Sequence, residues 1–281
     1  MKQKKDVIAQ WSESAQYWEK HRERIREMFA PVTHALIEDA RISEGDTVLD
    51  VAMGPGEPAL SLAEVVGAAG KIVGTDAVAE MVEAARREAA RRGLRNTHFE
   101  TAVAEKLAYE NDSFDAAVSR FGVMFFPSPA AGVREMLRVV KPGGRVAMAA
   151  WHFAQRNPFH SVLADVVDRH VPSPPPEQGA PDAFRFATPG ELLRVFESAG
   201  AQNSSERLLQ FSIKAKVSPE EYWKMRSEIS EKLRSKLAQL SEAQLGELKR
   251  EVLEAIQKYS TNEAVTFPGE VLLVRGEKAT K

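Results

Sequence analysis

The sequence lacks cysteine altogether: none occurs among its 281 residues. Disulfide bonds and thiolate metal sites are therefore excluded, and we expect no metal. No apolar run is long enough to span a bilayer. The basic start, Met1-Lys-Gln-Lys-Lys5, leads into a polar stretch instead of the apolar core of a signal peptide. We therefore expect a cytoplasmic protein without an integral membrane segment.

The chain also has little net charge. Lys and Arg number 38 against 40 Asp and Glu, which leaves −2. A protein whose main partner is nucleic acid needs a basic excess or a basic stripe, so we expect no nucleic acid partner. With 43% hydrophobic residues, the chain can bury a full core without covalent staples. One α/β domain with an elaboration is the expected organisation.

From residue 46 to residue 151, short apolar strands alternate with helical patterns. The predicted strands are Thr47–Val51, Lys71–Asp76, His98–Ala102, Ala116–Ser119 and Arg145–Trp151, and the predicted helices are Ala59–Val66, Ala79–Arg92 and Ala131–Val140. This alternation is typical of an α/β fold with a parallel sheet covered on both faces. In such sheets the ligand binds beyond the carboxyl ends of the strands, beside the first strand.

The segments on either side of this region are mainly helical. Residues 6–40 show helical spacing, and Pro31 is expected to interrupt it. The C-terminal predictions are a proline-rich loop at 152–185 with one short helix at His160–Asp168, a helix capped by Thr188, a strand at 206–215, a pair of amphipathic helices at 218–260 capped by Ser218, and a last strand at Glu270–Arg275.

These patterns predict three parts. They are an N-terminal helical cap at 1–44, an α/β core at 45–217 and 261–281, and a helical insertion at 218–260. A lid over the ligand, an oligomer contact such as a homodimer interface, and plain packing against the sheet edge are the alternatives for the insertion.

A glycine turn at Gly54 and Gly56 follows the first predicted strand. Glycines there let a ligand approach the backbone closely. Asp76 ends the second strand, and its carboxylate suits a ribose hydroxyl pair. Gly54-x-Gly56-x-x-Ala59 followed by Asp76 also fits the dinucleotide fingerprint. The pattern therefore indicates a nucleoside-containing cofactor without distinguishing one cofactor from another.

Three residues of the turn favour a cation over a diphosphate. Asp50 lies four residues before Gly54, where a carboxylate suits a cationic ligand and repels a pyrophosphate. Pro55 and Pro58 each remove a backbone N–H group that a diphosphate would use.

Further motifs follow in order along the chain. They are Gly74-Thr-Asp76 with Met81, Ala104-Glu105-Lys-Leu, Ser113-Phe-Asp115, Ser119-Arg-Phe-Gly-Val-Met-Phe-Phe126 and Leu137-Arg-x2-Lys-Pro-Gly-Gly144. Together with Thr47–Gly56, they resemble class I S-adenosylmethionine-dependent methyltransferases, most closely the branch of the ubiquinone/menaquinone biosynthesis methyltransferases. The resemblance covers roughly residues 45–151. It implies a Rossmann-like sheet of parallel strands with an antiparallel C-terminal strand, and S-adenosyl-L-methionine as the cofactor.

The resemblance also implies a role for individual residues. The positions expected at the cofactor are Asp50, Ala52, Gly54 and Gly56 along the methionine moiety, Asp76 with Ala77 at the ribose, Met81, Val103, Ala104 and Glu105 at the adenine, and Ser119 and Phe121 beside the sulfonium. Ordinary core packing is an equal alternative for Met81 and Phe121. Two positions depart from the family pattern: Ala52 replaces the first glycine, and Val103 replaces an Asp that commonly bonds the adenine amino group.

Methyl transfer from a sulfonium is an in-line displacement, so alignment and desolvation do most of the work and a base is needed only if the acceptor loses a proton. The candidate bases are His152 and His160, with a structural role as the alternative for each. Arg120 is a candidate for polarising or binding an acidic acceptor. Tyr17, Phe125 and Trp151 are the expected walls of the acceptor pocket. Such walls suit a small apolar or aromatic acceptor.

Two other classes of function remain open at this point. An NAD(P)-dependent oxidoreductase would be expected to carry a Tyr-x-x-x-Lys constellation or a similar one, and the sequence has none. A non-catalytic S-adenosylmethionine-binding protein on the same fold is the second alternative, for which Ala52 and Val103 are the hints.

Overall fold

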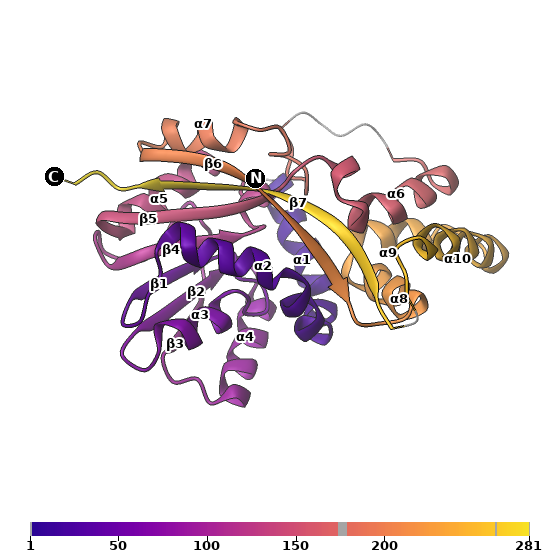
Figure 1. The fold of residues 1–281 in the computed structure, drawn as a ribbon, viewed down its shortest axis with the longest axis horizontal. Coiled ribbons are helices and arrows are strands. Elements are labelled where there is room, and N and C mark those ends of the chain that lie inside the picture. Colours follow the sequence, from indigo (N-terminus) through magenta and orange to yellow (C-terminus); the bar gives the residue numbers. More distant parts are fainter. Residues whose placement is uncertain (1, 174–178, 262, 281) are drawn as a thin grey trace.

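The computed structural model describes residues 2–173, 179–261 and 263–280 (Figure 1). In chain order the elements are α1 (Lys2–Lys20), α2 (Arg22–Ala40), β1 (Thr47–Val51), α3 (Ala59–Val66), β2 (Lys71–Asp76), α4 (Ala79–Arg92), β3 (Thr97–Thr101), β4 (Phe114–Arg120), the 3₁₀ helix η1 (Val123–Phe125), α5 (Pro129–Val139), β5 (Val140–Trp151), η2 (Ala154–Arg156), α6 (Pro158–His170), α7 (Glu191–Ser198), β6 (Gln202–Ala215), α8 (Pro219–Ile229), α9 (Glu231–Leu237), α10 (Glu242–Gln257) and β7 (Val265–Glu277). Within these described residues, no helix is long and apolar enough to cross a membrane.

The strands form one seven-stranded sheet in the order β3-β2-β1-β4-β5-β7-β6. β1 pairs in parallel with β2 and β4, and β5 continues the parallel part beside β4. β7 runs antiparallel to both β5 and β6. The predicted α/β class, with an antiparallel strand at the C-terminus, is therefore confirmed. The strand order changes direction between β1 and β4, near the middle of the sheet, and such folds bind ligands at this switch point.

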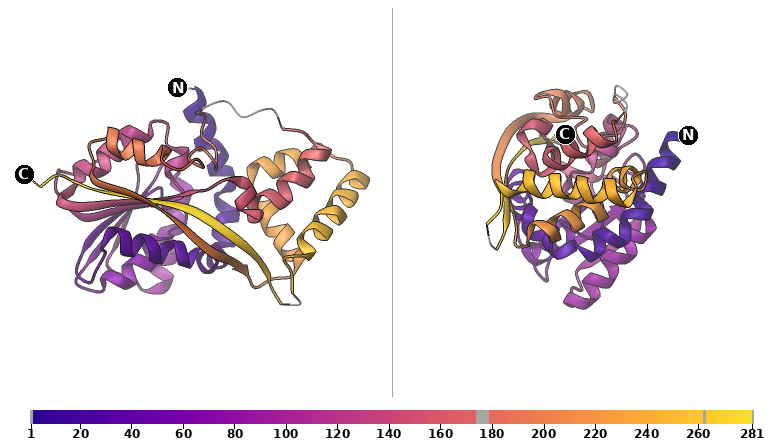
Figure 2. Two further views of the ribbon diagram at one scale, coloured as in Figure 1. Left: turned by 45° about the horizontal axis from the view of Figure 1, so that its top comes forward. Right: turned by 90° about the vertical axis from the view of Figure 1, so that its right-hand side faces the viewer.

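Helices cover both faces of the sheet. On one face, α2 lies across β4, β5, β6 and β7 and is joined to α4 by an ion pair between Arg22 and Glu88, whose atoms lie 2.6 Å apart. On the opposite face, α5 and α7 pack against each other (Figure 2). β1 is buried from both sides, as the full burial of Val48 and Leu49 shows.

A second group of helices lies at the far end of the two longest C-terminal strands. β6 and β7 extend from the sheet toward α6, α8, α9 and α10, which gather at the right of Figure 1. α1 connects this group to the sheet side, because it contacts α4, α8 and α9. The Trp18 indole N–H donates to the carbonyl of Ile229 at 3.1 Å, and Arg234 donates to the Ser14 hydroxyl at 2.8 Å.

Three local predictions are wrong. Pro31 does not interrupt the N-terminal helices: α2 continues through it, and the break falls at His21. The helix predicted to begin at Thr188 begins at Glu191 after Gly190, which has a left-handed φ of 84°. The predicted helical pair at 218–260 is three helices.

Serine caps explain the three-helix division. Ser230 accepts a hydrogen bond from the Leu233 N–H and starts α9, and Ser241 accepts one from the Gln244 N–H and starts α10. The Ser218 cap of α8 is confirmed, with Glu221 completing a capping box. Each serine therefore begins its own helix.

Asn157 gives a test of how β5, β7 and α6 are held together. Its side chain is fully buried, and its Nδ2 donates to the carbonyls of His152, Phe153 and Glu270 at 3.0–3.1 Å. Its Oδ1 accepts from the Glu270 N–H at 2.9 Å. We expect Asn157→Ala to lower the free energy of unfolding by about 3 kcal/mol, because buried backbone groups lose their partners. Urea denaturation measures this.

Asn111→Ala is the matched control, because exposed Asn111 accepts one hydrogen bond from Arg138. The control should change the unfolding free energy by less than about 0.5 kcal/mol. Equal losses in the two variants would contradict the role given to Asn157.

Candidate cofactor and acceptor site

The loop after β1 turns through three residues in the left-handed region. Ala52 has φ 59°, Gly54 φ 59° and Gly56 φ 115°. A methyl group added at Gly54 would meet no atom within 4 Å, whereas one at Gly56 would lie 2.6 Å from Leu60 Cδ1. Gly56 is therefore needed for packing against α3, and Gly54 leaves room for a ligand to approach the backbone.

Asp50 is fully buried below this loop. Its Oδ2 accepts the Ala59 N–H at 2.8 Å, at the start of α3, and its Oδ1 has no hydrogen-bond partner in the described structure. Burial raises the pKa of this carboxyl to about 8, although the positive charge of Arg120 acts in the opposite direction. A buried oxygen without a partner fits a ligand that brings a cation.

Asp76 connects the end of β2 to the glycine turn. Its Oδ2 accepts the Gly54 N–H at 2.8 Å, and its Oδ1 accepts the Val78 N–H at 3.0 Å. Burial raises its pKa to about 6, and the hydrogen bonds from the backbone limit the rise. Each carboxylate oxygen can accept a second hydrogen bond, so ribose hydroxyls can be added to these contacts.

Unpartnered polar atoms gather at the carboxyl edge of the sheet. Asp50 Oδ1, Thr75 Oγ1 and Ser119 Oγ are buried without a hydrogen-bond partner in the described structure, and they come from β1, β2 and β4. Buried polar groups are normally paired, so three such atoms at one edge indicate a polar ligand. S-adenosylmethionine, which carries an ammonium group, a carboxylate and ribose hydroxyls, fits this set of donors and acceptors.

The unusual residue of the turn, Ala52, is matched by a glycine in the segment between β4 and η1. A Cβ built on Gly122 would lie 2.5 Å from Ala52 Cβ and 2.7 Å from Ser119 Oγ. The Ala52 methyl group therefore occupies space that only glycine at position 122 leaves open. Phe121, directly before Gly122, also has a left-handed φ, of 63°. Ala52 and Phe121 thus each lie just beyond the end of a strand, in a backbone conformation that residues other than glycine rarely adopt.

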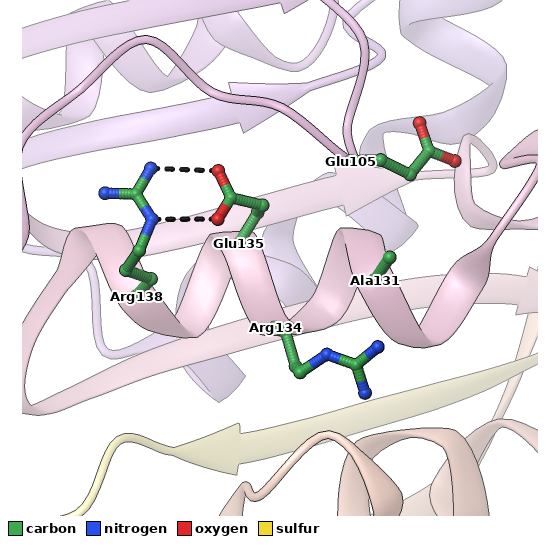
Figure 3. A pocket seen from close by; sticks show the side chains of 5 residues that line it. All are labelled: Glu105, Ala131, Arg134, Glu135 and Arg138. Atoms are coloured by element: carbon green, nitrogen blue, oxygen red, sulfur yellow. Dashed lines mark hydrogen bonds and ion pairs between the residues drawn. The ribbon is translucent and has the colours of Figure 1, made fainter.

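The residues expected at the adenine differ in where their side chains lie. The Glu105 side chain faces α5, where it accepts the Ser128 N–H at 2.9 Å. It lines a surface groove with Ala131, Arg134, Glu135 and Arg138 (Figure 3). Ala104 is buried, and Val103 and Ala77 are partly exposed in loops. Any cofactor contact in this segment is therefore more easily made by backbone groups than by the Glu105 carboxylate.

Met81 packs under α1. It is buried together with Val78 and with Ala15 of α1, and the ring of Trp11 from the same helix meets Phe125 edge-on at 5.1 Å. α1 therefore covers the edge of the molecule that runs from the start of α4 to η1. Phe125, expected at the acceptor, lies at this contact with α1.

A cluster of aromatic rings continues from the end of β4. The rings of Phe121 and Trp151 stack at 4.4 Å with an angle of 1°. Phe29 from α2 meets Phe121, Trp151 and Phe159 edge-on at 5.4–5.6 Å. Tyr222 from α8 lies 5.9 Å from Phe159 and donates its hydroxyl to the Phe159 carbonyl. We call Phe29, Phe121, Trp151, Phe159 and Tyr222 the aromatic cluster.

Two polar side chains lie within the aromatic cluster. The His160 ring is 4.6 Å from that of Trp151, and its Nε2 is buried without a partner in the described structure. The Arg226 guanidinium lies 4.2 Å from the Phe159 ring centre, and its Nη2 is 3.4 Å from His160 Nδ1. Burial lowers the pKa of both groups, and the charge of Arg226 adds to the lowering at His160. His160 is therefore neutral at pH 7.

The remaining predicted residues, His152, Arg120 and Tyr17, make contacts with residues outside the aromatic cluster. His152 Nδ1 is 3.0 Å from Glu270 Oε2. Arg120 is buried, donates to Thr33 Oγ1 at 2.7 Å and to the Glu57 carbonyl at 3.3 Å. The Tyr17 ring packs under the guanidinium of Arg234 at 4.9 Å.

Of the predicted acceptor-side residues, the structure thus brings together Trp151 and His160. Phe29, Phe159, Tyr222 and Arg226 were not anticipated. A signal existed for Arg226: it follows Tyr222 by four positions, so it interrupts the apolar stripe of α8 with a charge.

Comparison with known proteins agrees with this geometry. Residues 48–144 match the methyltransferase domain family. The matched segment is similar to a methyltransferase domain, and the rest of the chain lies outside this match. This segment contains the glycine turn, Asp76 and the β4 end. The match does not favour the alternative of a nicotinamide-dependent oxidoreductase.

Relatives of the methyltransferase domain include two named enzymes. The ubiquinone/menaquinone biosynthesis C-methyltransferase UbiE of Bdellovibrio bacteriovorus is 40% identical over 137 residues, which are 48% of this chain and 57% of that protein. The aklanonic acid methyltransferase DauC of Streptomyces sp. is 29% identical over 186 residues, 62% of this chain and 83% of that protein. The chain spans about half the length of most of the curated relatives it matches. The YcgJ protein of Bacillus subtilis has the same fold, with a TM-score of 0.56 at 21% identity over 89% of this chain and 98% of that one.

The contact between Ala52 and Gly122 gives a prediction for the domain. We expect Gly122→Ala to destabilise the protein by about 2 kcal/mol, because its Cβ would overlap the Ala52 methyl group. Ala52→Gly should have a small effect, since relief of the left-handed strain is offset by the greater freedom of the unfolded chain. In the double variant the penalty of Gly122→Ala should fall by at least about 0.5 kcal/mol, as measured by denaturant unfolding. Additive effects would show that the two residues do not share this space.

Proposed function

We propose that the protein transfers a methyl group from S-adenosyl-L-methionine to a small apolar or aromatic acceptor by in-line displacement, releasing S-adenosyl-L-homocysteine. The observation that carries the proposal is the unpartnered, buried Oδ1 of Asp50 beneath the glycine turn of a methyltransferase domain. The names of UbiE and DauC, one referring to ubiquinone and menaquinone biosynthesis and the other to aklanonic acid, support a small-molecule acceptor.

Each cofactor-side residue has a distinct part in this proposal. The Asp50 carboxylate would hold the ammonium group of the methionine moiety, and Gly54 would leave room for that moiety beside the backbone. Asp76 accepts the ribose hydroxyls while it keeps its bonds to the Gly54 and Val78 N–H groups. When bound, S-adenosylmethionine supplies an electrophilic methyl group on a sulfonium. Phe121 and Ser119, at the end of β4, border the place where that group is expected.

The acceptor side has the chemistry that methyl transfer needs. The aromatic cluster excludes water and offers ring faces to an apolar or aromatic acceptor. The Nδ1 of the neutral His160 imidazole faces the donor groups of Arg226, so its Nε2, which has no partner in the described structure, carries the proton and can donate a hydrogen bond to an acceptor molecule. His152 remains a candidate base and Arg120 a candidate for electrostatic assistance. We further propose that α1, with the rest of the 1–44 cap, and the 218–260 insertion act as the lid of this site, because α1 touches α4, η1, α8 and α9.

Binding of the cofactor is the first test. Calorimetry with S-adenosylmethionine, S-adenosylhomocysteine, NAD and NADP should show binding of the first two ligands alone. Asp76→Ala should weaken S-adenosylmethionine binding at least tenfold, or about 1.4 kcal/mol, because the ribose loses its acceptor. The control, Asp165→Ala on the exposed side of α6, should leave the affinity unchanged. Absence of S-adenosylmethionine binding at millimolar ligand would overturn the proposal.

The pH dependence of binding tests the part given to Asp50. In the free protein its pKa of about 8 keeps it largely protonated at pH 7. A cationic ligand favours the carboxylate, so binding releases a proton, and the affinity should rise roughly fivefold between pH 7 and pH 8 before it levels off. Asp50→Asn should bind more weakly and without this rise. A wild-type affinity that is independent of pH would contradict this assignment.

The same carboxyl also affects stability. Because its pKa is higher in the folded protein than in the unfolded chain, the folded state binds the extra proton, and the free energy of unfolding falls as the pH rises from about 4 through about 8. In Asp50→Asn this fall in the free energy of unfolding should be absent. Denaturant unfolding of both proteins at pH 5 and at pH 8 measures the difference.

A further inference from the structure

Arg226 is a buried cation without an acidic partner in the part of the chain that the structure describes. Its side chain is 8% exposed, and no carboxylate of the described residues lies within ion-pair distance of its guanidinium. Its polar contact is His160 Nδ1 at 3.4 Å, and its Nε is buried without a hydrogen-bond partner in the described structure. Phe159 supplies a ring face to the guanidinium at 4.2 Å, which compensates part of the lost hydration.

Other buried cations of the described structure have partners. Arg145, 7% exposed, is 2.7 Å from Glu277. Lys236, 8% exposed, pairs with Asp168. Arg120 donates hydrogen bonds to Thr33 and to the Glu57 carbonyl, and the negative charge of Glu57 acts on it. Burial of a charge is costly unless an opposite charge or hydrogen bonds compensate it. The position of Arg226 therefore calls for an anion that the described chain does not provide.

The surroundings of Arg226 show what kind of anion would fit. The His160 ring turns its Nδ1 toward the guanidinium, and its Nε2 has no partner among the described residues. The ring of Phe159 lies against the guanidinium, and that of Trp151 lies against His160. The contacts continue from Arg226 through His160 and Trp151 to Phe121 at the end of β4. An anion bound at Arg226 therefore belongs to a molecule whose apolar part lies along the aromatic cluster, toward the cofactor side.

We propose that Arg226 and His160 bind a carboxylate of the methyl acceptor, and that the acceptor is an aromatic or apolar monocarboxylic acid. This inference rests on the proposed methyl transfer and specifies its substrate class. A guanidinium presents two parallel N–H groups to a carboxylate. A single guanidinium also balances one negative charge, which favours a monocarboxylate over a phosphate monoester. The Tyr222 hydroxyl, bonded to the Phe159 carbonyl at 2.9 Å, holds α8 against α6 and so positions Arg226 beside His160.

The experiment compares an acid with its neutral analogue. The probes are 1-naphthoate and 1-naphthamide, and binding is measured by calorimetry in the presence of saturating S-adenosylhomocysteine. The wild type should bind the acid at least tenfold more tightly than the amide. Arg226→Met should lose this preference, and Arg226→Lys should keep part of it because it retains the charge without the paired N–H groups. The control, Arg250→Met in α10, removes a 69% exposed arginine side chain and should keep the full preference.

Thermal unfolding distinguishes a binding role from a structural one. If Arg226 is kept for a ligand, Arg226→Met replaces an unpaired buried charge by an apolar chain of similar length, and the Tm without ligand should equal or exceed that of the wild type. A lower Tm with retained acid preference would overturn the inference in favour of a structural arginine. Should Arg226→Met fail to fold, the comparison of acid and amide in the wild type and in Arg226→Lys still decides.

The outcomes also separate this inference from the proposed function. Wild-type protein that binds S-adenosylmethionine but shows no preference for the acid would refute the acid acceptor and leave methyl transfer standing. Protein that binds no S-adenosylmethionine would refute the proposed function itself.

Discussion

The carboxyl edge of the sheet depends on two acidic side chains, the buried Asp50 and the partly exposed Asp76, that accept backbone N–H groups. Asp50 takes the Ala59 N–H and thereby fixes where α3 begins, while Asp76 takes the Gly54 N–H and fixes the middle of the turn. Between these two bonds the chain must reverse within a few residues, which requires the left-handed conformations found there. The geometry that leaves Gly54 open is thus a consequence of where the acids lie. Desolvation of both acids raises their pKa values, so the site is built at an electrostatic cost.

Packing from the segment that follows β4 holds the strained residues at this edge in place. Ala52 adopts a conformation that costs an L-residue roughly 1–2 kcal/mol relative to its preferred ones, yet its methyl group has room because Gly122 has no side chain. Phe121 is held in a similar conformation by its stacking on Trp151 and its backbone bond to Ala149. Both strained residues border the proposed path of the methyl group. Strain of this kind persists where the surrounding structure over-determines it, as at ligand sites.

The sequence was sufficient for features that depend on local signals. Apolar runs that alternate with helical patterns predicted the parallel strands. The end of α4 at Arg92 was also predicted, and Gly93, which follows it, has a φ of 70°. Features that depend on tertiary contacts were not predictable. Pro31 remains inside α2 because the buried face of that helix, including the fully buried Val32, packs on the sheet and outweighs the lost hydrogen bond. Arg226 and His160 are 66 positions apart, so no local pattern shows that their side chains meet.

The two halves of the proposed site obey different constraints. The cofactor side lies within residues 48–144, the segment that matches the methyltransferase domain family, and its glycines and acids are tied to the backbone geometry of the sheet. Arg226 lies outside that segment, on α8. A substitution that changes the acceptor-binding charge on α8 leaves the residues of the cofactor loop unchanged. Substrate choice is therefore expected to reside in α6 and the helical insertion, and a buried arginine with no acidic partner among the described residues is the clearest mark of that choice.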